Sequence, residues 1–517
     1  MAIDASTLIQ ISYFDALATA DLEEQKNIQL ARKYHSGDQT VHLTSRAQEF
    51  LALNSEVQFC LNICQTIVTA VLDELSVVGF DTTEAASPNG DKPQSQWASR
   101  LWQVNRMDAM QNDVHEAALR DREAFVIVDW NRENKTPRFT FHERFVSTEA
   151  GGSGTGCWMV YENDDPNQPA IAAVKQWAET IELNGRLTTR TRRTVYYPDR
   201  IEKWYFDTTD WARYMEDGES WPIPWTVKKK PIGIPVIHFK NEGLMPEAWD
   251  ALPLQDAINK IALDILAAAD SAGFRIFVAL GFVPTSDGQT PKADGSNALE
   301  IAPGQVIGTT KSKTEASFDA IEAADVEPLM NTLKDLISIA AQITSTPVSR
   351  FVMTRQVAGN ETIKEQDKPL LKKAKKRRVL LGNSWEDALT IARTLANLYG
   401  RAGLDDTVQI STLWEHSTSL DELKTKREAL SLPLEQLWLE AGYSNEQINQ
   451  MKETEEYRLQ REKLLWEAAS AAIDAGVTLE TVLRRSGIDA DEFGKIGTEK
   501  LADIKTKQED VIPPVGQ

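Results

Sequence analysis

The chain has 517 residues, 42% of them hydrophobic and 26% charged, which is typical of a globular protein with several domains. Its formal net charge of -21 argues against tight, sequence-independent binding to nucleic acid, which depends on basic residues. Three cysteines do not form a disulfide framework, and neither a signal peptide nor an apolar run of membrane-spanning length is found. We therefore expect a chain that folds in a reducing cytosol, with no membrane contact.

The N-terminal half predicts a mixed α+β unit. Val57–Leu75 and Trp97–Arg122 are typical of helices, because their apolar residues recur at the helical period. Ala124–Trp130 predicts a strand, and Arg138–Phe239 predicts a series of short strands and turns. Eight of the 14 tryptophans lie from Trp130 to Trp249, so we expect a large aromatic core in this part.

Two amphipathic helices follow, separated by an insert. The first is predicted over Leu254–Ala272, and the second over Val326–Ile343, where Thr346-Pro347 stops it. The insert contains short predicted strands, including Arg275–Val283, around a Gly/Asp/Pro-rich loop. The apolar side chains that we expect in the interface formed by these helices are Ile258, Ile261, Ile265, Leu266, Leu333, Leu336 and Ile337.

A third, much longer helix is predicted from about Glu361 to Tyr399, and it would span roughly 60 Å at 1.5 Å per residue. Pro369 should kink it. Its second half has one apolar face, whereas its first half is rich in lysine. This lysine stripe is either a solvated face paired with nearby carboxylates or a surface that meets phosphate groups. Beyond it, the C-terminal third predicts further helices.

Motifs for catalysis and metal binding are not found in the sequence. Gly304–Lys311 has residue types of a phosphate-binding loop at the wrong spacing, and the six histidines are scattered. Cys60 and Cys64 are four residues apart on an expected helix, which favours two core thiols over half of a metal site. We therefore expect no catalytic, cofactor-binding or metal-binding residues, and no enzymatic activity.

Several short segments, in a fixed order, match the pattern of one protein family. They are Tyr34-x-x-Gly37-Asp38, Leu43–Arg46, Asn62–Gln65, Val77-x-Gly79-Phe80, Trp102-x-x-Asn105-x-x-Asp108, Ala124–Val128, Lys230–Val236, His238-Phe239-x-Asn241, Asp256–Lys260, Thr344–Pro347, Lys368–Ala374 and Trp385-Glu386. Through these segments, from about Tyr34 to Gly442, the chain resembles bacteriophage portal proteins of the SPP1-like group.

The resemblance implies an α+β portal-type fold. Portal proteins form cyclic rings, usually of about twelve subunits, around a central channel. The implied regions are an N-terminal wing (1–253), a first stem helix (254–272), a small α/β clip (273–325), a second stem helix (326–347), a tunnel loop (348–360), a long helix with the C-terminal part of the wing (361–454), and a helical crown and tail (455–517).

The resemblance also implies a role at one vertex of a phage or prophage capsid, after assembly in the host cytoplasm. Double-stranded DNA would pass through the channel during packaging and ejection. The implied partners are the terminase large subunit, a head-completion or adaptor protein, and the major capsid and scaffolding proteins. The candidates for channel residues that face the DNA are Arg350, Arg355, Lys364, Lys368, Lys372, Lys373, Lys376 and Arg377.

Two alternatives remain open at this point. One is a different ring or minor head protein of the virion, although such adaptors lack two stem helices with an insert between them. The other is a packaging ATPase or nuclease, against which the missing phosphate-binding loop argues.

Overall fold

The structure is a computed structural model that describes residues 22–42, 56–84, 92–147, 154–183, 186–206, 210–216, 218–273, 277–280, 317–320, 325–351 and 360–415, together with residues 438 and 448. The chain divides into two compact units, one of residues 1–83 and 97–415 and one of residues 84–96 and 416–517. The elements below belong to the first unit, apart from the first residues of helix α5.

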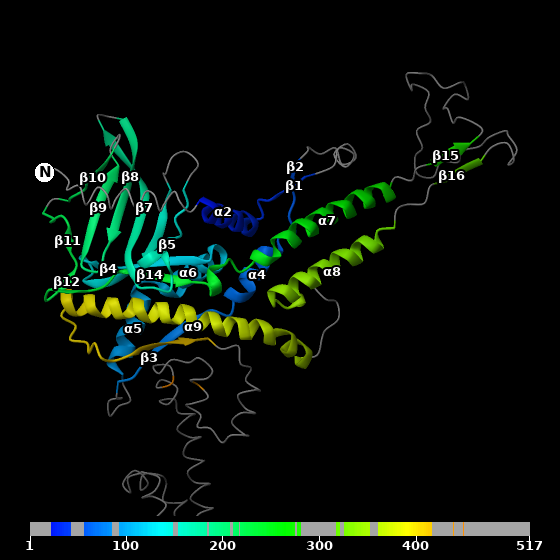
Figure 1. Cartoon of the computed structure of the whole chain (residues 1–517). Helices are drawn as coiled ribbons and strands as arrows, with labels where there is room; N and C mark the ends of the chain where they lie inside the picture. Colours follow the sequence, from blue (N-terminus) through cyan, green and yellow to red (C-terminus); the bar gives the residue numbers. More distant parts are fainter. Residues whose placement is uncertain are drawn as a thin grey trace, which may run out of the picture. The chain divides into compact units, whose positions relative to one another are not determined.

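The described α-helices are α2 (Leu22–Ser36), α4 (Ile63–Leu72), α5 (Pro93–Val104), α6 (Met107–Asp121), α7 (Leu252–Gly273), α8 (Glu327–Thr344) and α9 (Asn360–Tyr399) (Figure 1). Short 3-10 helices are η1 (Glu162–Asp164), η2 (Glu242–Leu244), η3 (Trp249–Ala251) and η4 (Val348–Arg350). The mixture of helix and sheet confirms the expected α+β class.

Within the described residues, the strands form one sheet of six, one of three and several pairs. The six-stranded sheet has the order β10 (Trp211–Arg213), β9 (Arg200–Phe206), β8 (Arg186–Tyr196), β7 (Ala170–Leu183) and β6 (Gly156–Tyr161), with β11 (Ile223–Pro224) also on β9. The three-stranded sheet has the order β14 (Val236–Lys240), β4 (Glu123–Asn131) and β5 (Thr136–Glu143). The pairs are β1 (Thr40–His42) with β2 (Glu56–Gln58), β3 (Val77–Thr82) with β17 (Ile410–Trp414), β12 (Thr226–Val227) with β13 (Lys230–Pro231), and β15 (Phe277–Leu280) with β16 (Ser317–Ala320).

Strand β4 is buried on both faces, which explains its uninterrupted apolar sequence. Val126 and Val128 belong to the main core, to which α4, α5, α6 and α9 also contribute. Phe125 and Ile127 pack on the opposite face in a cluster with Cys157 of β6. The three-stranded sheet therefore lies between a helical layer and the six-stranded sheet.

The second half of α9 is the central helix of the main core. Leu381, Trp385, Ala388, Leu389, Ala392 and Leu395 are all 1% exposed or less. The indole ring of Trp385 makes edge contacts with Trp102 and Phe239, at centroid distances of 4.9 Å and 4.5 Å. The apolar face predicted for this helix is confirmed except at Tyr399, which is 49% exposed. The helix extends through Pro369 as one element.

The aromatic core expected between Trp130 and Trp249 is confirmed in the six-stranded sheet. Trp158, Trp204 and Trp211 are buried together with Phe145, and Trp221 packs on them. Trp204 and Trp221 meet edge to face, with centroids 4.9 Å apart. Strand β4 coincides with the strand predicted over Ala124–Trp130, and β5 to β9 and β14 overlap or lie within Arg138–Phe239, where short strands were predicted.

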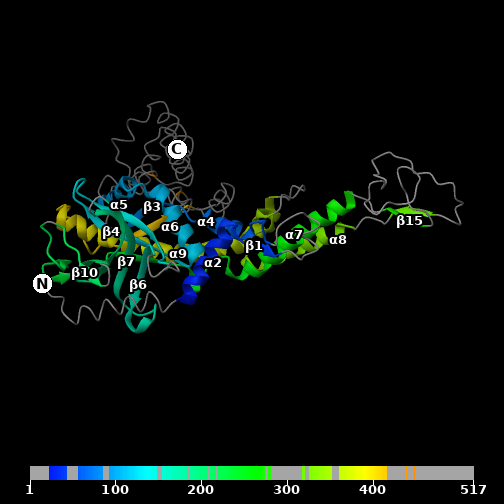
Figure 2. The ribbon, with the colours of Figure 1, turned by 90° about the horizontal axis from the view of Figure 1, so that it is seen from above.

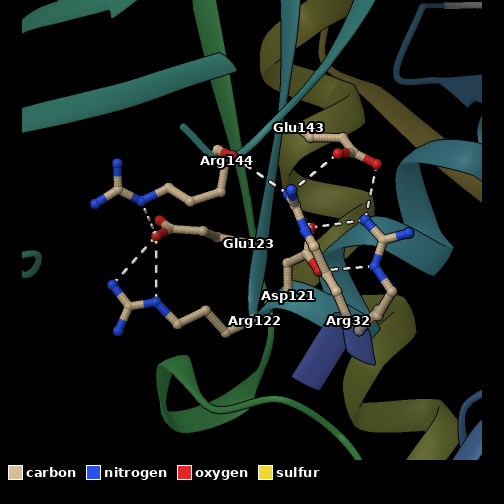
Figure 3. Close-up of polar contacts among 7 residues, drawn as sticks. Arg32, Asp121, Arg122, Glu123, Glu143 and Arg144 are labelled. Carbon is tan, nitrogen blue, oxygen red and sulfur yellow. Dashed lines mark hydrogen bonds and ion pairs between the residues drawn. The ribbon is translucent and has the colours of Figure 1, made fainter. Parts of the chain in front are cut away.

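Helix α2 is fixed to α6 and β5 by ion pairs (Figure 3). Arg32 binds Asp121 at 2.6 Å and Glu143 at 3.1 Å, and the side chain of Asp121 is fully buried. Beside them, the buried Glu123 accepts a hydrogen bond from Arg144 Nε at 2.8 Å. Burial alone would raise the pKa of Glu123, but the charges of Arg144 and its other partners outweigh burial and lower the pKa.

Three sequence predictions differ from the structure. The helix predicted from Val57 begins only at Ile63, where the Asn62 side chain accepts a hydrogen bond from the Gln65 amide and caps the helix. Glu56–Gln58 is instead a strand, so Cys60 precedes the helix and only Cys64 lies on it. Cys64 is buried, and Cys60 is partly exposed.

The helix predicted over Trp97–Arg122 is in fact two helices, α5 and α6. Between them Arg106 has a φ of 54°, which an α-helix does not allow. The side chain of Asn105 donates hydrogen bonds to the carbonyls of Leu101 and Pro137, and this contact holds the break in place. Strand β17 was not predicted.

Candidate functional site

Helices α7 and α8 lie side by side, as Figures 1 and 2 both show, and they bracket residues 274–326. The antiparallel pair of β15 and β16 lies between them in the sequence, partly where a strand was predicted. The other short strands predicted for this insert lie outside the described residues. The observed bounds of the two helices are within two residues of the predicted ones.

The predicted interface residues of α7 and α8 fall into two groups. Ile258 is fully buried, and Leu333, Leu336 and Ile337 are partly buried against the main core. Ile261 and Ile265 are half-buried, whereas Leu266 is 48% exposed. On α8, three further large apolar side chains are at least 40% exposed, namely Met330, Ile339 and Ile343. Within one chain, this helix pair therefore leaves apolar surface uncovered.

The first turns of α7 are anchored by buried amides. Gln255 Oε1 accepts hydrogen bonds from the amides of Ile63 and Cys64 at 2.8 Å and 3.3 Å, and so caps the N-terminus of α4. Asn259 Oδ1 accepts from the Leu61 amide at 2.9 Å. Both amide side chains are 0% exposed. Buried hydrogen bonds of this kind require one geometry, so the start of α7 has a defined position on α4.

The lysine stripe of α9 contains both exposed and paired cations. Lys368 is exposed and pairs with Glu365, as expected for a solvated helix face whose lysines pair with nearby carboxylates. Lys376 is 59% exposed and lies 3.2 Å from Glu242. Lys372 is also exposed. The side chain of Lys364 lies outside the described residues.

Lys373 and Arg377 instead belong to a buried ion cluster. The Arg377 side chain is 8% exposed and its Nη2 lies 3.1 Å from Glu247, whose side chain is 2% exposed. Lys373 also contacts Glu247, and Arg377 also contacts Glu242. Burial alone would raise the pKa of Glu247, but the charges of Lys373 and Arg377 outweigh burial and lower the pKa.

The cluster lines a groove of about 440 Å³ between η2, the end of α8 and the first half of α9. Ile343, Met245 and Pro369 provide its apolar surface, and Lys372 and Asp250 add charge of both signs. The groove therefore combines exposed apolar side chains with a rim of mixed charge.

Of the two arginines in the predicted tunnel loop, only Arg350 lies in the described residues. It belongs to η4 and its Nη1 lies 2.8 Å from Asp73 Oδ2, with side chains 39% and 46% exposed. Arg355 and the whole of the predicted crown (455–517) lie outside the described residues.

No three His, Cys, Asp or Glu side chains in the described part come together in an arrangement that could hold a metal ion. Among the helices in this part, none has both the length and the apolar composition needed to cross a bilayer.

The sequence model of one protein family, described as phage portal protein, SPP1 Gp6-like, matches residues 17–461 of the chain. This match covers well over half of the 517 residues. The chain belongs to the SPP1 Gp6-like family of phage portal proteins. The resemblance found in the sequence is thereby confirmed.

Two curated relatives of this portal-family chain are named portal protein. The one from Mycobacterium phage D29 is 20% identical over 325 residues, which cover 56% of this chain and 64% of the relative. The one from Mycobacterium phage L5 is 20% identical over 302 residues, which cover 55% of this chain and 56% of the relative. The match thus covers less than two thirds of the length of either relative.

Two solved structures are also similar to the portal-family chain. A chain from the virion of a native gene transfer agent particle matches with 10% identity and a TM-score of 0.35, covering 81% of this chain and 99% of that one. A chain from the neck of a native gene transfer agent particle, computed with C12 symmetry, matches with 11% identity and a TM-score of 0.36, with the same two coverages.

The sequence did not reveal the buried polar residues that hold α7, α8 and α9 of the portal-family chain in place. Glu247, Gln255 and Asn259 lie in or near the predicted first stem helix. Asn259 falls in the family-matching segment Asp256–Lys260, but no motif indicates the contacts of these three side chains. A polar residue on the apolar side of a helix, as at Asn259, is the one available signal. Glu247 carries no such signal, because its partners Lys373 and Arg377 are more than a hundred residues away.

Proposed function

We propose that this chain is the portal subunit of a tailed bacteriophage or prophage. Identical chains, about twelve of them, close into a ring at one capsid vertex, and double-stranded DNA enters and leaves through its channel. The observation that carries this proposal is the family match over residues 17–461. In this reading, the regions named wing, stem, clip, tunnel loop and crown keep the boundaries expected from the sequence.

The uncovered apolar surface of α7 and α8 supports a ring. Leu266, Ile339 and Ile343 are each between 44% and 52% exposed in the single chain. A head-to-tail contact that repeats around an axis covers such residues in every copy without leaving a free end. A single chain would instead expose them to water at an unfavourable free energy.

The net negative charge of the chain supports a channel that binds DNA only weakly. A net charge of -21 disfavours strong, lasting contacts with phosphate, so DNA can slide. The exposed lysines of α9, Lys368, Lys372 and Lys376, could then make weak contacts with the DNA backbone, without sequence preference. Lys373 and Arg377 are both paired with Glu247, and Arg377 also with Glu242, so their contribution to such contacts is smaller.

The chain itself then needs no catalytic residue, because a separate terminase motor drives the DNA. The clip would dock this motor during packaging and the head-completion proteins afterwards. The wing would meet the major capsid and scaffolding proteins. Such a subunit would carry no cofactor and no metal ion. The finished ring would be part of the virion.

A packaging assay tests this function. Proheads assembled with or without the chain are incubated with terminase, ATP and genomic DNA, and the DNA that resists nuclease is measured. We expect protected DNA only in proheads that contain the chain. Equal protection in both samples, or ATP hydrolysis by the purified chain alone, would contradict the proposal.

A further inference from the structure

A buried carboxylate connects three parts of the chain at the end of α8. Glu247 lies between the cationic groups of Lys373 and Arg377, one helical turn apart on α9. Two cations and one carboxylate in a site where Glu247 is only 2% exposed form a tight electrostatic unit. Removing Glu247 would leave the Lys373 ammonium group without its carboxylate, whereas removing Lys373 would leave Glu247 paired with Arg377.

Lys373 also binds the end of α8 directly. Its Nζ donates a hydrogen bond to the carbonyl oxygen of Thr344, the last residue of that helix, at 2.6 Å. The next residue, Ser345, has a φ of 54° and ends the helix. A cation at this position also satisfies a free carbonyl and interacts favourably with the helix dipole.

Glu247 is held from the opposite side by the core. Its amide donates a hydrogen bond to the carbonyl of Leu119 in α6 at 2.8 Å, and the side chain of Asn241 donates to its carboxylate at 3.1 Å. The backbone amide of Asn241 in turn donates a hydrogen bond to the backbone carbonyl of Arg122 at 2.8 Å. A continuous series of polar contacts thus leads from α6, through Glu247 and Lys373, to the last carbonyl of α8.

We propose that Glu247 and Lys373 are positioning residues that fix the end of α8, and with it the start of the segment leading to α9, against the core. The segment leading to α9 is the expected tunnel loop, which would face DNA in the channel. A role of these two residues in DNA passage therefore rests on the proposed function. Loss of the Lys373 contact would free the last turn of α8 while leaving Glu247 neutralised by Arg377.

Hydrogen exchange on the purified, assembled protein tests the placement of α8. The reporters are the amides of Ser345 and Thr346, which bond to carbonyls in the last turn of α8. In Lys373→Met, which keeps the aliphatic stem, we expect exchange at these amides to be about tenfold faster than in the wild type. The matched control Lys372→Met, an exposed neighbour, should stay within about twofold of the wild type.

Two further variants separate charge from bulk. Lys373→Arg restores the cation and should return exchange to near the wild-type rate, whereas Glu247→Gln should resemble Lys373→Met. If Glu247→Gln fails to fold, the exchange rates of Lys373→Met alone test the proposal, because Glu247 in that variant is still paired with Arg377. Wild-type exchange in Lys373→Met, or equal acceleration in Lys372→Met, would overturn the proposal.

The packaging assay adds a readout that a purely structural role would not change. Lys373→Met should form rings in normal yield but protect less DNA from nuclease, and Lys373→Arg should recover protection. Normal packaging by a variant with fast exchange would overturn the role in DNA passage. Absence of packaging in the wild type would overturn the proposed function instead, and the exchange result at α8 would still stand.

Discussion

His115 shows how one buried side chain links α6 to α9 and to the turn between α4 and β3. Its Nδ1 lies 2.9 Å from the carbonyl oxygen of Leu75, and its Nε2 accepts a hydrogen bond from Trp385 Nε1 at 2.9 Å. The ring is 0% exposed, and burial lowers the pKa of His115 to about 4. The tautomer with the proton on Nδ1 satisfies both contacts, so the neutral ring is the native form.

This lowered pKa predicts acid sensitivity. The unfolded chain binds a proton at His115 near pH 6.5, whereas the folded chain does so only near pH 4, so stability falls as pH decreases between these values. From pH 7 to pH 5 the wild type should lose about 2 kcal/mol more than His115→Gln, which does not titrate. Urea unfolding of both proteins at each pH measures the difference. Equal losses would contradict the assigned role.

The buried ion pair of Glu123 with Arg144 predicts that replacing Glu123 strongly lowers the stability of the fold. Its side chain is 6% exposed and is paired with Arg144, which is 10% exposed. Glu123→Ala should therefore reduce the free energy of unfolding by about 3–5 kcal/mol, because the buried Arg144 would lose its ion pair with this buried carboxylate. The control is Asp129→Ala, which breaks the exposed pair with Arg138 and should cost at most about 1 kcal/mol. Similar losses in the two variants, measured by urea unfolding, would refute this account.

At the scale of elements, apolar periodicity was enough to predict the three long helices. The stripes of α7, α8 and α9 repeat over many turns, so their limits were predicted to within two residues. Strand β17 could not be predicted, because its five residues form a strand only through pairing with the distant β3. Gly382 marks the close packing of α9 on this strand, since a Cβ there would lie 2.7 Å from Thr412 Oγ1.

The ion pairs of α9 were unpredictable for a similar reason. The sequence shows eight cations between Lys364 and Arg378, and it shows the nearby carboxylates, so the Lys368–Glu365 pair was foreseeable. The partners Glu242 and Glu247 come from a segment that only the folded chain brings close. Which lysines stay exposed therefore depends on the tertiary structure, and the sequence alone treats them alike.

Helix α7 gives a prediction about assembly. Leu266 is 48% exposed in the single chain, so Leu266→Asp should fold normally and retain the wild-type melting temperature of an isolated subunit. If neighbouring copies cover this residue, the buried aspartate would lack a partner, at a free-energy cost of several kcal/mol per contact. Size-exclusion chromatography should then show subunits in place of rings. The control is Asp264→Asn at an exposed position of the same helix, which should assemble.

For the whole molecule, the proposed function requires that copies of one chain repeat around an axis. The family match, the uncovered apolar surface of α7 and α8, and the strong negative charge all agree with a ring that conducts DNA. The number of copies and the presence of a central channel are therefore the decisive quantities.

Electron microscopy of the purified full-length chain measures both quantities directly. The account predicts closed rings with a central channel wide enough for double-stranded DNA, and a single rotational symmetry of about twelve copies. A chain that stays a monomer at every concentration, or that assembles into particles without a channel, would contradict it.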